Sequence, residues 1–315
     1  MKENLKIPHK PVLLKEVLEG FSNLKEGIFI DCTVGYGGHS REILLKNKDI
    51  KLIGIDKDKE AIEFNQKYLQ KEFKDRVTLI RGSFSEVLPK LLEEFSSKRK
   101  KVVGILADFG VSSLQLDKKE RGFAFESDFL DMRMDQSNPK SAKVVLNSYP
   151  QERLEEIFKK FGELKEAKVL AREIVKYRSS KEITSAKEFS QIIQRVVRSK
   201  GKKNPSTLPF QAVRIEVNDE LKEIENFLDT LEVFKPKDSI VGLITFHSLE
   251  DRLVKNRFRK WSKRCICPPE AMRCECGGNR AFGKELNKKP ITPSKQELLE
   301  NPRSRSAKLR FFQFK

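Results

Sequence analysis

Short apolar runs alternate with amphipathic helical patterns along the first hundred residues of the chain. Four runs are apolar enough to be buried strands, at residues 28–34, 51–56, 76–84 and 102–110. Between them, apolar positions recur every three or four residues, the spacing of a helix that packs one face on a core. Nearly continuous apolar strands separated by helices are typical of a parallel sheet covered on both faces. The pattern therefore predicts an α/β fold for this part of the chain.

The alternation stops after the fourth apolar run. From about residue 115 to 210 no segment has a strand pattern, and the apolar spacing is helical throughout. We therefore predict an inserted all-helical domain at 115–210. The polar, breaker-rich segment 198–209 marks where the chain leaves the insertion. The remaining residues, 1–114 and 211–315, are predicted to form one discontinuous domain.

After the insertion the chain returns to the α/β pattern. One long helix is expected over residues 210–231, because apolar residues recur there on one helical face. A turn and a fifth strand follow at 235–248, then a long basic loop, and a last strand at 308–314.

The turn after the first strand is rich in glycine. The stretch DCTVGYGGHS begins with Asp31 and has Gly35, Gly37 and Gly38 within four positions. Such a turn lets backbone approach a nucleotide-like ligand closely. The dinucleotide fingerprint G-x-G-x-x-G is matched only in part, because Ser40 stands where its third glycine would be.

Acidic and aromatic residues follow other predicted strands and narrow the choice of ligand. Asp56 ends the second strand, where a carboxylate accepts hydrogen bonds from adenosine ribose hydroxyls; the alternative is a charge that stabilises the next helix N-terminus. Asp31 suits the ammonium group of an amino acid and would repel a pyrophosphate. Phe84 follows the third strand and offers a ring for adenine, and Asp108 ends the fourth. The set favours S-adenosylmethionine over NAD.

The charge of the chain suggests an anionic partner. The formal net charge is +18 and the pI about 9.6. Basic residues concentrate in segments 195–203, 255–264 and 301–315. For such a chain nucleic acid is the first candidate, and a lysine-rich surface is the plain alternative. No apolar run approaches the ~18 residues of a membrane span and no signal peptide is evident, so we expect a cytoplasmic protein without a membrane partner.

The five cysteines are unevenly distributed. Cys265, Cys267, Cys274 and Cys276 form a C-x-C pair, a gap of six residues and a second C-x-C pair. Four thiolates this close suit a structural zinc ion, and reduced or redox-labile thiols are the alternative. Cys32 stands alone in the first predicted strand and is expected in the core.

Ten stretches spread over the whole chain match the motifs of one known family. They are HKPVLLKEV (9–17), DCTVGYGGHS (31–40), IDKD (55–58), GSF (82–84), ILADFGVSSLQLD (105–117), RGFAF (121–125), LDMRMD (130–135), FQAVRIEVNDEL (210–221), ITFHSLEDR (244–252) and NPRSRSAKLR (301–310). In these stretches the chain resembles the bacterial 16S ribosomal RNA cytosine-N4 methyltransferases of the RsmH/MraW type. The resemblance implies a class I Rossmann-like methyltransferase sheet, dependent on S-adenosylmethionine, with an inserted all-helical domain. It also implies methylation of a cytosine N4 amine in the decoding region of 16S rRNA of the small ribosomal subunit.

The resemblance also assigns cofactor contacts. The positions that match the family's are Gly37, Gly38, His39, Asp56, Phe84, Asp108 and Gln115. Asp31 and Gly35 are further candidate cofactor contacts, because they lie at the end of the first predicted strand and in the glycine-rich turn.

The reacting groups are harder to assign. Asp108 ends the fourth strand, where an acceptor could contact the amine or instead the cofactor. His247 ends the fifth strand and could orient the base or relay a proton; a structural hydrogen bond in the turn is the alternative. Gln211, Arg214 and Asn218 share one helix face and are candidate RNA contacts, or an ordinary helix surface.

The sequence is compatible with two other functions. One is a non-catalytic RNA-binding or ribosome-assembly factor on a methyltransferase scaffold, against which the intact Asp31, Gly35, Gly37, Asp56 and Asp108 argue. The other is an amino-methyltransferase acting on DNA, another nucleic acid or a small molecule. Three basic segments argue against a small molecule, but charge does not separate DNA from RNA.

Overall fold

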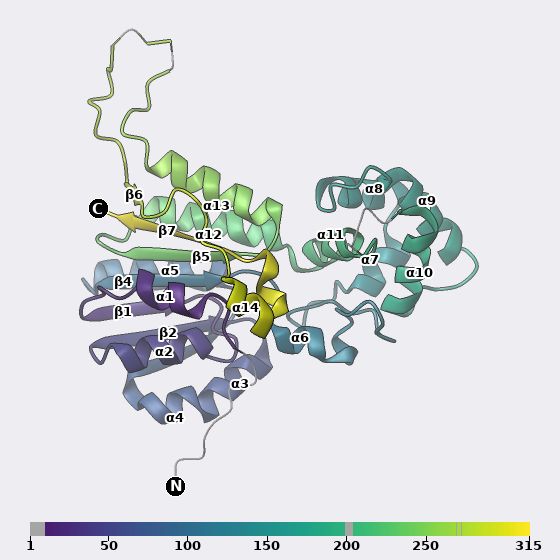
Figure 1. Ribbon diagram of the computed structural model, residues 1–315, viewed down its shortest axis with the longest axis horizontal. Coiled ribbons are helices and arrows are strands. Elements are labelled where there is room, and N and C mark those ends of the chain that lie inside the picture. Colours follow the sequence, from purple (N-terminus) through teal and green to yellow (C-terminus); the bar gives the residue numbers. More distant parts are fainter. Residues whose placement is uncertain (1–9, 199–203, 269, 272) are drawn as a thin grey trace. The chain divides into compact units, whose positions relative to one another are not determined.

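The computed structural model describes residues 10–198, 204–268, 270–271 and 273–315. It divides into two compact units (Figure 1). The sheet unit comprises Met1–Gly110 and Lys222–Lys315, and the helical unit comprises Val111–Leu221. Residues 199–203 of the predicted linker, and His9 of the first motif, lie outside the described residues.

In the described residues of the sheet unit, seven strands form one sheet in the order β3-β2-β1-β4-β5-β7-β6. The five neighbouring strands β3, β2, β1, β4 and β5 pair in parallel. Strand β7 is antiparallel to both β5 and β6. The strand order reverses direction between β1 and β4, and ligands of open α/β sheets bind beyond the carboxyl ends at such a point. The strands are β1 (Gly27–Asp31), β2 (Ile50–Asp56), β3 (Val77–Arg81), β4 (Val102–Asp108), β5 (Ile240–Thr245), β6 (Gly283–Glu285) and β7 (Lys308–Phe314).

Every strand predicted from an apolar run is present, and the α/β fold class is confirmed. The short β6 was missed, since its sequence GKE has no apolar pattern and it forms only by pairing with β7 at the sheet edge.

Helices cover both faces of this sheet, as the strand composition predicts. One face packs on α5 (Phe84–Ser97), α12 (Glu220–Phe234) and α13 (Ser248–Trp261) (Figure 1). The other face packs on α1 to α4. The remaining elements of this unit are α1 (Leu14–Gly20), α2 (Gly38–Lys46), α3 (Lys59–Lys67), α4 (Leu69–Phe73), η1 (Lys74–Arg76), α14 (Lys295–Glu300) and η3 (Pro302–Ser306).

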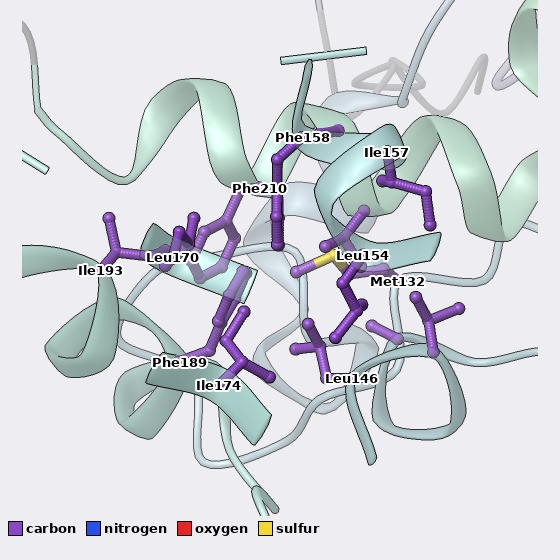
Figure 2. Close-up of a cluster of buried hydrophobic side chains, with 14 of the residues drawn as sticks. Met132, Leu146, Leu154, Ile157, Phe158, Leu170, Ile174, Phe189, Ile193 and Phe210 are labelled. Atoms are coloured by element: carbon purple, nitrogen blue, oxygen red, sulfur yellow. The ribbon is translucent and has the colours of Figure 1, made fainter. Parts of the chain in front are cut away.

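The helical unit has its own hydrophobic core. Figure 2 shows aromatic rings from different helices meeting among aliphatic side chains. Phe189 stacks between Phe158 and Phe210, with ring centroids 6.4 and 5.0 Å away. A capping box formed by Ser185 and Glu188 starts α10. The elements of the helical unit are α6 (Ser113–Asp117), η2 (Lys119–Arg121), α7 (Ala142–Ser148), α8 (Gln151–Lys160), α9 (Ala167–Arg178), α10 (Ala186–Val196) and α11 (Thr207–Asn218).

The helix predicted over residues 210–231 is in fact two helices. Asp219 adopts a left-handed conformation (φ 51°) between α11 and α12, which ends the first helix. Phe210 and Val213 pack in the helical unit, whereas Ile224 packs on the sheet. The expected return to the sheet unit at residue 211 is therefore wrong, because α11 buries its apolar face in the helical unit and the return comes at Lys222.

Within the described ranges, no helix combines the length and apolarity needed to cross a membrane.

Candidate active site

Three neighbouring strands of the sheet unit end in a carboxylate. Asp56, Asp31 and Asp108 are the last residues of β2, β1 and β4, which lie side by side at the switch point. The parallel register aligns their carboxyl ends, so the three acids share one edge of the sheet. The sequence placed all three at strand ends, and the fold brings those ends together.

Asp31 is buried and held by two donors. Its Oδ1 accepts a hydrogen bond from the Thr33 backbone N–H (3.1 Å), and its Oδ2 accepts one from the Ser40 hydroxyl (2.6 Å). Thr33 also accepts a hydrogen bond on its Oγ1 from the Asp108 backbone N–H (2.7 Å). These contacts tie the ends of β1 and β4 to each other and to the first turn of α2.

Asp56 fixes the glycine turn. Its Oδ2 accepts the Gly35 N–H and its Oδ1 accepts the Asp58 N–H, both at 2.8 Å. A carboxylate has about four acceptor positions, so hydroxyl donors of a ligand can still be accommodated.

The glycine turn leaves the start of α2 without a side-chain cap. Gly37 is the N-cap residue (φ 75°), and it makes no side-chain cap hydrogen bond to the start of the helix. Such an end attracts a carboxylate or another anion. A Cβ at Gly37 would lie 2.3 Å from Asn65 Oδ1, and one at Gly38 would lie 2.3 Å from the Pro11 ring. Both glycines are therefore required by close packing.

Burial makes ionisation of the three acids difficult. It raises the pKa of Asp31 to about 6, and repulsion from Asp56 adds to this effect. Burial likewise raises the pKa of Asp56 to about 6. The pKa of Asp108 lies well above its usual value, because of burial first and then repulsion from Asp31 and Glu250. A cation bound among these carboxylates would relieve the repulsion, whereas an anionic phosphate would increase it.

Asp108 also presents an unused acceptor. Its Oδ1 is buried and has no hydrogen-bond partner among the described residues. Buried polar atoms in native proteins are nearly always paired, so an orphaned acceptor at a ligand-binding edge indicates a donor that arrives with a ligand.

An aromatic cluster lies beside the strand ends. Phe84, the first residue of α5, is 5.8 Å from Phe109 and 5.7 Å from Phe227, measured between ring centroids. Phe84 is only partly buried.

Both histidines named as site candidates make structural contacts. His39 is buried, and its Nε2 donates to the Val12 carbonyl (2.8 Å). His247 is the N-cap of α13, where its Nδ1 accepts the Glu250 N–H (3.5 Å) and its Nε2 lies 3.2 Å from Glu250 Oε1. For His247 this is the structural hydrogen bond that the sequence left as the alternative.

The remaining candidate contacts belong to the helical unit. Gln115 is buried and its Oε1 accepts the Ser112 N–H (3.0 Å). Gln211 donates to the Phe161 carbonyl (3.1 Å), and Arg214 pairs with Glu220 at 2.8 and 2.9 Å.

Asn218, the third residue of the proposed RNA-facing set, is buried. Its amide nitrogen donates to the Met132 and Arg214 carbonyls (2.8 and 2.9 Å), and its oxygen accepts the Met134 N–H (2.8 Å). Its hydrogen-bonding groups thus hold α11 to the segment around Met132, which argues against an RNA contact.

We expect Asn218→Ala to lower the free energy of unfolding by about 1–3 kcal/mol, since it leaves buried backbone groups unpaired. Gln211→Ala on the same helix is the matched control and should change stability much less. Chemical denaturation of both variants measures the difference; equal stability of Asn218→Ala and the unaltered protein would contradict the structural role.

Sequence reasoning missed three supporting residues. Thr33 and Ser40 lie inside the glycine-rich motif and bind the ends of β4 and β1. Asn65 is fully buried on α3 and donates to the Gly35 and Ala61 carbonyls (2.6 and 2.8 Å). Its signal in the sequence was a lone polar residue on the apolar face of a predicted helix.

Three features define the class of protein. They are the strand order, the single antiparallel strand next to the sheet edge, and the acidic strand ends beside a glycine turn. This combination is that of the Rossmann-like methyltransferases that depend on S-adenosylmethionine. The chain belongs to the MraW methylase family, whose model matches residues 6–315.

Similar proteins match nearly the whole length of the chain. A protein of Sulfurovum sp. (strain NBC37-1) named "Ribosomal RNA small subunit methyltransferase H" is 57% identical over 311 residues, covering 99% of each chain. A protein of the same name from Wolinella succinogenes is 54% identical over 309 residues, covering 98% of this chain and 99% of its own.

Solved structures are more distant. An rRNA methylase from Streptococcus thermophilus is 11% identical and covers 97% of both chains, with a TM-score of 0.39. A methyltransferase from Streptococcus mutans in complex with SAH is also 11% identical, covering 98% of this chain and 99% of its own, with a TM-score of 0.38. These scores are too low for either likeness to bear on the site.

Proposed function

We propose that this methyltransferase transfers a methyl group from S-adenosylmethionine to the N4 amine of a cytosine in the decoding region of 16S rRNA. The observation that carries the catalytic part is the buried, unpartnered Oδ1 of Asp108 at the carboxyl end of β4. The RNA substrate is supported by the names of the relatives. Because ribosomal RNA is found in the cytoplasm, the proposal also places the protein there.

The residues of the sheet unit fit the cofactor. The two cationic groups of S-adenosylmethionine, an ammonium and a sulfonium, match an acceptor cluster formed by Asp31, Asp56 and Asp108. The open N-terminus of α2 at Gly37 and Gly38 suits the cofactor's carboxylate. When bound, the cofactor supplies an electrophilic methyl group.

The other assigned contacts have separate roles. Asp56 accepts hydrogen bonds from the ribose hydroxyls, Gly35 shapes the turn and the Phe84 ring packs against adenine. His39 acts through its backbone, because its ring Nε2 is used by the Val12 carbonyl. Gln115 remains a cofactor contact proposed from the family resemblance alone.

The amine needs activation before it can attack. The lone pair of cytosine N4 is delocalised into the ring, so acceptors aimed at its N–H bonds favour the pyramidal, nucleophilic form. Asp108 Oδ1 and the carbonyls of Phe109 and Gly110 lie at the end of β4, where such acceptors are required. The N–C bond forms as the bond between the methyl group and the cofactor sulfur breaks, and Asp108 takes the proton that leaves N4. Asp108 must be ionised to do this, and a bound cation offsets the burial and repulsion that raise its pKa. His247 is better suited to orienting this edge through Glu250.

The exposed basic residues supply phosphate contacts. Part of the basic segments is used internally: Arg310 pairs with the buried Asp251 (2.7 Å) and Arg257 pairs with Glu232 (2.8 Å). Arg259 on α13 and Arg305 on η3 are exposed and are the stronger candidates for RNA backbone contacts.

Methylation at cytosine C5 is the chemical rival, and the cysteines disfavour it. That reaction needs a thiolate nucleophile. Cys32, the cysteine next to the carboxylate cluster, is buried, and burial raises its pKa well above the usual value, so it stays a thiol.

We expect cofactor affinity to fall as the pH is lowered. Cofactor binding requires ionised Asp31 for the ammonium group and ionised Asp56 as the acceptor for the ribose hydroxyls. The pKa values of both are about 6 in the free protein. Protonation of one such group makes the affinity for S-adenosylmethionine about tenfold lower at about pH 5 than at about pH 7.5. Protonation of both groups lowers the affinity further.

The same shifts set the stability of the free protein. Because folding raises these pKa values, the stabilisation is complete below the unfolded value of 3.8 and is lost as the pH rises through about 6. The melting temperature of the free protein should therefore fall from about pH 5 to about pH 7.5, while the shift caused by S-adenosylmethionine grows. Thermal melts with and without cofactor measure both; a cofactor-induced shift that does not vary with pH would contradict the role of these acids.

The substrate is tested by offering labelled S-adenosylmethionine with small ribosomal subunits, naked 16S rRNA or DNA. The proposal expects label in ribosomal RNA, in the particle or free, and none in DNA. Label in DNA alone would support the other amino-methyltransferase hypothesis, and no transfer to any substrate despite cofactor binding would support a non-catalytic RNA-binding factor.

A further inference from the structure

The four clustered cysteines lie in a loop that the proposed methyl transfer does not use. The loop joins α13 to β6, and Figure 1 shows it extending away from the sheet. Its base is closed by backbone hydrogen bonds from Arg280 N to Arg264 O (2.9 Å) and from Phe282 N to Trp261 O (2.8 Å). Beyond this base, between Lys263 and Arg280, every described residue is at least partly exposed. The loop thus has no hydrophobic core to hold its shape.

The thiols converge despite this exposure. The sulfur of Cys274 lies 3.5 Å from that of Cys265 and 3.6 Å from that of Cys276. The sulfurs of Cys265 and Cys276 are 3.6 Å apart. With Cys267 included, all four sulfur atoms lie within 4.8 Å of one another. None of the four is in a disulfide. Four sulfurs bound to zinc at about 2.3 Å form a tetrahedron with edges of about 3.8 Å.

The backbone supports negative charge on the sulfurs. The Ile266 N–H donates to Cys276 Sγ (3.4 Å), and the Glu275 N–H donates to Cys267 Sγ (3.3 Å). Each C-x-C pair therefore supplies a backbone donor to a sulfur of the other pair. Gly277 and Gly278, with φ values of 79° and 65°, turn the chain back directly after Cys276.

The charge around the cluster favours a tetrathiolate metal centre. One divalent cation with four thiolates has a net negative charge. Arg264, Arg273 and Arg280 lie on the same loop, and with Lys263 they outnumber its acidic residues. The acidic residues are Glu270 and Glu275, so the loop has a net positive charge that offsets the charge of such a centre.

We infer that Cys265, Cys267, Cys274 and Cys276 bind one structural Zn²⁺ ion that fixes this loop. Each cysteine that is still protonated releases its proton to solvent as its Zn–S bond forms, and no electron is transferred. The metal replaces the missing hydrophobic core, as is usual in small segments without one.

The inference is tested by measuring zinc in the full-length protein, purified under reducing conditions and loaded with Zn²⁺ before removal of free metal. We expect one zinc ion per chain, and a large loss of zinc in Cys265→Ser and Cys274→Ser. Cys32→Ala, which removes the one cysteine outside the loop, should keep its zinc. Substitution with Co²⁺ should give the charge-transfer and ligand-field bands of a tetrahedral thiolate site.

Proteolysis provides a second readout that does not depend on catalysis. The zinc-loaded protein should resist trypsin at Arg264 and Arg273, and a chelator should expose these sites in the unaltered chain. A zinc content far below one per chain after loading, retention of zinc in both serine variants, or paired disulfides in the reduced protein would overturn the inference. Failure to methylate RNA would leave the zinc measurement unaffected, so the two proposals fail independently.

Discussion

Asp108→Asn should lower kcat for methyl transfer by at least about a hundredfold. The asparagine oxygen can still accept a hydrogen bond from the amine, but it cannot take the proton that leaves N4. Because the pKa of Asp108 is already raised by burial and by Asp31 and Glu250, loss of its charge should not destabilise the fold. Single-turnover rates at saturating cofactor, together with the dissociation constant of S-adenosylmethionine, measure the effect.

The dissociation constant decides between the two roles left open for Asp108. As proton acceptor, its replacement lowers the rate and changes cofactor affinity by less than about tenfold. An unchanged rate at saturating cofactor with strongly weakened binding would make it a cofactor contact instead. Asp49→Asn is the matched control, because Asp49 is exposed at the opposite end of β2 and neither rate nor affinity should change.

Asp56→Asn should weaken cofactor binding and leave the rate at saturating cofactor nearly unchanged. We expect the dissociation constant of S-adenosylmethionine to rise about a hundredfold, which corresponds to about 3 kcal/mol. The physical reason is local: both carboxylate oxygens accept backbone N–H groups, from Gly35 and Asp58, and an amide nitrogen would point a donor at one of them. The glycine turn and the ribose contacts are then disturbed together.

At saturating cofactor, kcat of Asp56→Asn should stay within about threefold of the unaltered protein, since Asp56 does not touch the acceptor amine. Titration calorimetry gives the affinity, and the same Asp49→Asn control applies. An unchanged dissociation constant would contradict the ribose-binding role.

The sheet was predictable because its strands are buried on both faces. An apolar run such as residues 102–110 needs no long-range information to be assigned, and it places Asp108 at its end. The break between α11 and α12 was not predictable in the same way. Apolar spacing continues from Val217 to Leu221 across the left-handed Asp219, so periodicity cannot show that the two helices enter different cores.

For the candidate site too, local features could be predicted from the sequence and long-range contacts could not. Asp31, Asp56 and the glycines lie in a local motif, and their chemistry could be inferred from residue type and position. That Asp108 Oδ1 is unpartnered and that Asn218 is fully engaged depends on segments distant in the sequence. For the cysteines, the spacing indicated a metal site, but only the fold brings all four sulfurs within 4.8 Å.

The position of the transferred methyl group tests the central claim most directly. Small ribosomal subunits or 16S rRNA that lack the modification are incubated with the protein and isotopically labelled S-adenosylmethionine, and the RNA is digested to nucleosides for mass spectrometry. The account predicts label in N4-methylcytidine from one site in the decoding region, and its near absence with Asp108→Asn. Label at cytosine C5, on ribose or on another base would contradict it.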